Sequence, residues 1–120
     1  MKKVLVVEDN ETNMYLMRFI LQKAGYEIIE AWDGAAGVES AEKENPDLIL
    51  MDMQLPVLDG YGAVKKIRAA YSGKDVPIIA ITSYAMVGDR EKTLNAGCTA
   101  YIEKPINPET FLDEINKYLK

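Results

Sequence analysis

Residues 3–10 read KVLVVEDN, and this stretch decides the fold class. Lys3 to Val7 is an almost unbroken run of β-branched residues and leucine, which is the pattern of a strand covered on both faces. The run stops at Glu8, and Asn10 can cap a helix that follows. A strand buried on both faces and followed at once by a helix predicts the first unit of an α/β fold with a parallel sheet.

The rest of the chain repeats this alternation of strand and helix. Apolar runs predict further strands at residues 27–31, 47–52, 76–82 and 100–103. Caps, helical apolar spacing and closing glycines predict helices from Asn10 to Gly25, over 35–44, after Asp59, over 89–96 and from Asn107-Pro108 onward, with Asp33-Gly34 as a turn. Short connections between these elements indicate a doubly wound α/β fold with helices on both faces of the sheet.

Length and composition limit the possible functions. The 120 residues fit one compact domain, so we expect a single unit over residues 1–120. Cys98 has no partner for a disulfide, which favours a reducing compartment, the cytoplasm. The apolar run after Met1 is too short for a signal peptide or a membrane span, so we expect neither export nor a membrane partner. A net charge of −5 without a cluster of Lys and Arg disfavours a nucleic-acid partner.

Polar residues stand where four of the predicted strands end. They are Glu8 and Asp9 after the first strand, Asp52 at the third, Thr82 at the fourth and Lys104 after the fifth. Because the carboxyl ends of parallel strands share one edge, we expect these side chains to face one another. Each one alone is more easily explained as a solvated strand end, a helix cap or a surface turn. Their coincidence at four strand ends favours a functional site.

The residue types at this edge suggest phosphoryl chemistry assisted by a metal. The chain has no histidine, so any chemistry must use carboxylates, hydroxyls and lysine. Clustered carboxylates repel one another unless a cation lies between them. Mg2+ binds a few carboxylates and several waters, whereas calcium usually requires more protein ligands. With Mg2+ bound, Asp52 can act as a nucleophile towards phosphorus. Lys104 can then neutralise the phosphoryl oxygens, and Thr82 can donate a hydrogen bond to them.

Four motifs resemble, in order and over essentially the whole chain, the receiver domains of two-component response regulators. They are VLVVEDN (4–10), LMDMQLPVLDG (50–60), AITS (80–83) and YIEKP (101–105). The resemblance extends to single-domain regulators of the chemotaxis and cell-cycle kind. It implies a flavodoxin-like fold, in which five parallel strands in the order 2-1-3-4-5 are flanked by five helices.

The resemblance also implies a role for each residue of the site. The implied Mg2+ ligands are Glu8, Asp9, Asp52 and the carbonyl of Gln54. Asp52 would accept the phosphoryl group, while Thr82 and Lys104 would hold it. The Lys104–Pro105 peptide bond should be cis, an isomer that is far more accessible before proline than elsewhere.

Partners and signal output follow from the same resemblance. Tyr101 matches the aromatic residue that turns inward when Thr82 moves towards the phosphate. The altered surface would be the fourth helix, fifth strand and fifth helix, including Arg90 and Lys92. The implied partners are a sensor histidine kinase or histidine phosphotransfer protein as phosphodonor, and a downstream effector protein that docks on that surface.

The main alternative is an Mg2+-dependent aspartyl-phosphate phosphohydrolase, which uses the same nucleophile and metal. Those enzymes carry a second aspartate two residues after the nucleophile, where this chain has Gln54. A flavodoxin-like cofactor binder is disfavoured because Glu8 and Asp9 would repel a phosphate after the first strand. We therefore expect a signalling phosphoacceptor that assists only its own phosphorylation and dephosphorylation. Gln54 and Tyr84 lie where the family tunes the lifetime of the phosphate, so that lifetime stays open.

Overall fold

A computed structural model describes residues 2–55, 57–70, 75–83 and 87–119. In this part of the chain, five parallel strands form one sheet in the order β2-β1-β3-β4-β5. The strands are β1 (Lys3–Val7), β2 (Glu27–Ala31), β3 (Leu48–Asp52), β4 (Ile78–Thr82) and β5 (Ala100–Glu103). The predicted parallel sheet and its order 2-1-3-4-5 are confirmed.

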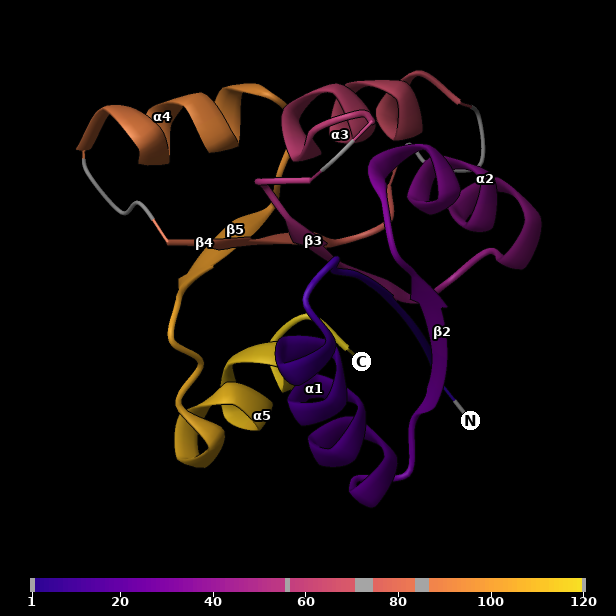
Figure 1. Cartoon of the computed structure of the whole chain (residues 1–120), viewed down its shortest axis with the longest axis vertical. Coiled ribbons are helices and arrows are strands. Elements are labelled where there is room, and N and C mark those ends of the chain that lie inside the picture. Colours follow the sequence, from indigo (N-terminus) through magenta and orange to yellow (C-terminus); the bar gives the residue numbers. More distant parts are fainter. Residues whose placement is uncertain (1, 56, 71–74, 84–86, 120) are drawn as a thin grey trace.

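Helices lie on both faces of this sheet. Those within the described residues are α1 (Glu11–Lys23), α2 (Gly34–Glu44), α3 (Gly60–Ala69), α4 (Val87–Asn95) and α5 (Pro108–Asn116). Figure 1 shows α2, α3 and α4 in one layer and α1 and α5 in the other, with the sheet between them. This is the doubly wound arrangement that the sequence predicts. None of these helices is long and apolar enough to cross a membrane.

Short polar side chains fix where several helices begin. Asn10 accepts a hydrogen bond from the backbone N–H of Asn13 (2.9 Å), and Asp59 and Asn107 cap α3 and α5 in the same way. These three predicted caps are confirmed. Asp33 was expected in a turn, but its carboxylate accepts from the Ala36 N–H at 2.8 Å, so it caps α2.

Three other predicted elements have different bounds in the structure. β3 begins at Leu48, and Asp47 before it binds the backbone of Lys3 twice: its N–H donates to the Lys3 carbonyl (2.8 Å) and its carboxylate accepts from the Lys3 N–H (2.8 Å). β4 begins at Ile78, directly after Pro77, which has no N–H to offer a neighbouring strand. The fourth helix covers Val87–Asn95, not residues 89–96.

Apolar side chains fill both spaces between the sheet and its helices. Alternate residues of a strand point to opposite faces, so Leu5 and Val7 enter one half of the core and Val4 and Val6 the other. All five residues of β3 and of β4 are buried. Polar side chains that could take part in chemistry therefore lie at the carboxyl ends of the strands, beyond the apolar core.

Candidate functional site

Strand register brings the predicted site residues to one edge of the sheet. Val7 pairs with Met51 and Asp52 pairs with Ile81, so Glu8, Asp52 and Thr82 lie close to the same level. Their side chains are almost inaccessible, with 0%, 3% and 5% of the residue surface exposed. Burying polar groups is costly unless they are paired, so this edge needs compensating partners.

Lys104 supplies the first of these partners. Its Nζ lies 3.2 Å from Glu8 Oε1 and 3.2 Å from Asp52 Oδ2, and only 17% of its side chain is exposed. The backbone N–H of Lys104 donates to the carbonyl of Thr82 at 2.8 Å, which ties the residue after β5 to the end of β4. The peptide bond to Pro105 is cis, as predicted. One ammonium thus bridges two buried carboxylates.

Backbone N–H groups hold the other oxygen of each carboxylate. Asn10 N–H donates to Glu8 Oε2 at 3.2 Å, and Gln54 N–H donates to Asp52 Oδ1 at 3.0 Å. Glu8 Oε1, by contrast, accepts no hydrogen bond within the described residues, although the Lys104 ammonium is near. That ammonium therefore balances the charge of this buried oxygen by its proximity, without the geometry of a hydrogen bond.

The pKa values reflect crowded negative charge. Burial, followed by the hydrogen bond and the charge of Asp52, raises the pKa of Glu8 to about 7, because together they outweigh the lowering by the Lys104 charge and the Asn10 N–H. For Lys104, burial acts to lower the pKa, but the charges of Asp52 and Glu8 outweigh it and raise the pKa above its ordinary value. The ammonium therefore stays charged, while Glu8 keeps a proton more readily than an ordinary glutamate.

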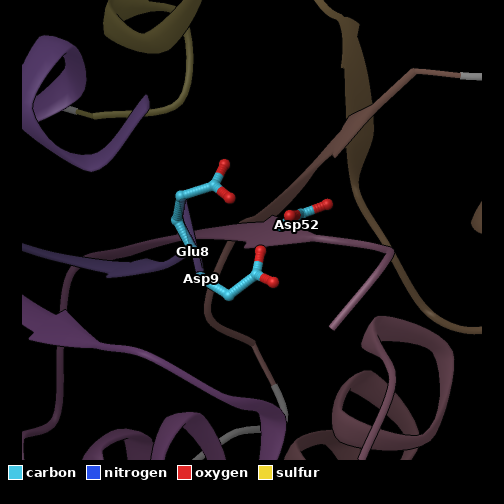
Figure 2. Close-up of side chains that lie close together, drawn as sticks. All are labelled: Glu8, Asp9 and Asp52. Atoms are coloured by element: carbon cyan, nitrogen blue, oxygen red, sulfur yellow. The ribbon is translucent and has the colours of Figure 1, made fainter. Parts of the chain in front are cut away.

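A divalent cation fits this arrangement. Carboxylate oxygens of Glu8, Asp9 and Asp52 lie within 4.8 Å of one another. Figure 2 shows the three carboxylates turned towards a common space at the ends of β1 and β3. Asp9 is exposed, which gives an ion and its waters access from solvent. An all-oxygen set of three converging carboxylates suits a hard cation such as Mg2+.

The remaining predicted residues lie around this centre. The Gln54 side chain is exposed, and the binding of an ion by its carbonyl stays a prediction. Tyr101 is half-buried on β5, where it pairs with Ala80 in the register of β4. Tyr84, the other residue expected to tune phosphate lifetime, lies outside the described residues. The backbone donors of Asn10 and Gln54 were missed, because every residue except proline offers such a group and no side-chain pattern marks it.

Known proteins share this fold and most of the chain. The polar-differentiation response regulator DivK of Brucella ovis is 42% identical over 118 residues, which cover 98% of this chain and 96% of DivK. The receiver domain of a sensor histidine kinase from Pseudomonas aeruginosa PAO1, solved with magnesium in its active-site cleft, is also 42% identical. It superposes with a TM-score of 0.92 over 98% of this chain and 97% of that one. For the chemotaxis response regulator CheY4 of Vibrio cholerae, the TM-score is 0.94 at 34% identity, over 99% of each chain.

The family comparison agrees with these relatives. The response regulator receiver domain is matched by residues 4–116, which include every residue of the site described above. The sheet order, the bridging lysine and the three convergent carboxylates are consistent with that match. The chain belongs to the response regulator receiver domain family.

Proposed function

We propose that Asp52 is the phosphoacceptor of this receiver domain, and that residues 1–120 act as one receiver unit. The observation that carries the proposal is the environment of the Asp52 carboxylate. One of its oxygens is anchored by the Gln54 N–H at 3.0 Å, and the other lies 3.2 Å from the Lys104 ammonium. The group is thus buried, oriented and accompanied by a cation, which are the conditions a carboxylate needs to act as a nucleophile.

We assign the Mg2+ ion to Glu8, Asp9 and Asp52, together with the carbonyl of Gln54. The convergence of the three carboxylates supports this assignment. When bound, the ion neutralises charge on the carboxylates and on an incoming phosphoryl group. These residues would therefore both hold the ion and set the position from which Asp52 reacts.

The protein groups account for the transfer step. A carboxylate oxygen of Asp52 forms a bond to phosphorus while the bond from phosphorus to the nitrogen of a phosphohistidine donor breaks and its electron pair returns to the imidazole. Lys104 neutralises the phosphoryl oxygens, and the Thr82 hydroxyl donates a hydrogen bond to one of them. Thr82 is suited to this role because it ends β4, next to β3, and its backbone already pairs with Lys104 (2.8 Å).

Receiver domains as a family are signalling phosphoacceptors. For this chain we propose that no other substrate is turned over, and that the site assists only its own phosphorylation and dephosphorylation. The exposed amide of Gln54 supports this, because it cannot serve as the acid and base that a phosphohydrolase places two residues after its nucleophile.

Receiver domains act between histidine kinases and effectors. We propose that a histidine kinase or a histidine phosphotransfer protein supplies the phosphoryl group and that an effector protein docks on α4, β5 and α5. Movement of Thr82 towards the phosphate, followed by the ring of Tyr101, would change this surface. A cytoplasmic location fits such a donor, which obtains its phosphoryl group from ATP. It also fits the free thiol of Cys98.

Phosphorylation by acetyl phosphate in the presence of Mg2+ tests the assignment. Intact-mass analysis should show one added phosphoryl group on the wild type and on Asp113→Asn, which removes an exposed carboxylate from α5. Asp52→Asn should gain none, and chelation of the metal should stop the reaction. Modification of Asp52→Asn at the wild-type rate would show that another residue is the nucleophile.

A further inference from the structure

Helix α4 carries two cations that each cover an aromatic ring of a neighbouring element. The guanidinium carbon of Arg90 lies 5.0 Å from the ring centroid of Tyr101 on β5. Lys92 Nζ lies 4.3 Å from the ring centroid of Tyr61 on α3. Both distances are within the range of about 6 Å in which a cation is attracted to the face of a ring. One helix can do this because α4 lies beside α3 in the same layer (Figure 1) and also contacts β5.

Tyr101 is neither a core residue nor a free surface residue. It is half-buried and packs against the core cluster that lies beneath α2 and α3. It also lines two surface cavities, of about 410 and 60 Å³, along β5 and α5. One side of the ring therefore has apolar neighbours, whereas another is covered by the Arg90 guanidinium.

Arg90 has no competing partner in the described part of the chain. It is exposed, and no carboxylate of a described residue lies within ion-pair distance of it. Arg18, in contrast, also lies over a tyrosine but is ion-paired with Glu30 at 2.5 Å. Among the described residues, the Tyr101 ring is thus the contact that positions Arg90.

We propose that Arg90 is a latch that holds Tyr101 in the resting state of the receiver. This inference rests on the proposed function, in which the Tyr101 ring moves when Thr82 is drawn to the phosphate. Inward movement would take the ring from beneath the guanidinium, so the contact stabilises only the resting state. A contact made in only one of two states favours that state according to the free energy of the contact. For a cation over an aromatic ring, the ratio of the two states changes by about two- to fivefold. Arg90 therefore raises the threshold for switching without touching the phosphoacceptor.

The chemistry of the side chain makes the latch specific. A guanidinium is planar and always charged, and it stacks on a ring more effectively than an ammonium does. Arg90→Lys should therefore keep part of the effect, and Arg90→Gln should abolish it. Lys23→Gln is the matched control, because it removes a contact of the same kind from Phe19 (5.7 Å) on α1, in the layer on the other side of the sheet.

Beryllofluoride with Mg2+ provides the test, with ¹⁹F NMR of fluorotyrosine-labelled protein as the report on the Tyr101 ring. Arg90→Gln should bind beryllofluoride about two- to fivefold more tightly than the wild type and should shift the free Tyr101 signal towards its bound position. Arg90→Lys should fall between the two, and Lys23→Gln should match the wild type. In a Tyr101→Leu background, Arg90→Gln should no longer change the affinity, because the latch has no ring to hold.

The possible failures can be told apart. If beryllofluoride leaves the Tyr101 signal of the wild type unmoved, the proposed switch itself is wrong. If the wild-type signal moves but Arg90→Gln binds beryllofluoride with wild-type affinity, the switch stands and the latch is refuted. An equal gain in affinity for Arg90→Gln with and without the Tyr101 ring would also refute the latch, since the effect would then come from charge alone.

Discussion

Protonation of Glu8 should compete with Mg2+ binding. The carboxylate is fully buried, and burial together with the neighbouring Asp52 raises its pKa to about 7. A metal ion needs the ionised form, so a proton on Glu8 must leave before the ion can use that ligand. The sign follows directly: Mg2+ affinity should rise as the pH rises through about 7 and should level off above it.

The size of the effect comes from the ionised fraction of Glu8. With a pKa of about 7, roughly one molecule in eleven is ionised at pH 6 and roughly ten in eleven at pH 8. The apparent Kd for Mg2+ should therefore be about tenfold weaker at pH 6 than at pH 8. Each ion bound should release about 0.9 proton at pH 6 and about 0.1 at pH 8.

Isothermal titration calorimetry in buffers of different ionisation enthalpy measures both quantities. Glu8→Gln keeps the shape of the side chain but cannot titrate, so its Mg2+ affinity should be weaker at pH 8 and nearly constant between pH 6 and 8. Asp113→Asn should keep the tenfold dependence of the wild type. A wild-type Kd that stays within twofold over this range, with no proton released, would refute the competition.

Three further predictions concern stability and reactivity. Arg68 donates from Nε to the Gly97 carbonyl (2.9 Å) and from Nη2 to Thr99 (3.2 Å), and also to the Val76 carbonyl. Arg68→Met should therefore lower the free energy of unfolding in urea by roughly 2–4 kcal/mol, whereas Lys65→Met should change it little. Burial raises the pKa of the Cys98 thiol to about 11, so native protein at pH 8 should react with iodoacetamide at least about 100-fold more slowly than unfolded protein; equal rates would contradict this. Val57 is 85% exposed with φ of 69°, so Val57→Asn should raise the urea unfolding free energy by roughly 0.5–1 kcal/mol, and any loss would argue against strain there.

Local patterns in the sequence were sufficient to predict the sheet. Unbroken apolar runs such as Val4 to Val7 indicate burial on both faces, and the rule for parallel strands then places the polar residues at their ends together. The predicted caps Asn10, Asp59 and Asn107 also depend only on near neighbours. Asp33 shows the limit, because an Asp-Gly pair is common in turns and also suits the start of a helix.

Long-range contacts could not be predicted in the same way. The Arg68 hydrogen bonds join α3 to residues 8 to 31 positions further along the chain, and Arg90 reaches a ring on β5. No period or motif encodes such partners, since they depend on how separate helices pack. The charge cluster was predictable as a group of residue types, but which carboxylate oxygens the Lys104 ammonium contacts depends on the direction of a single side chain.

The proposed Mg2+ binding and the proposed switch would both follow from the charges of the site. Glu8, Asp9 and Asp52 with the Lys104 ammonium leave two negative charges when all are ionised, which one divalent ion cancels. A phosphoryl group on Asp52 replaces one negative charge with about two. The added charge lies on the phosphoryl oxygens. The Lys104 ammonium would therefore be attracted to them more strongly than to the carboxylates that it now bridges. Lys104 is joined through its backbone N–H to the end of β4, so a movement of its ammonium towards these oxygens would take place directly beside Thr82.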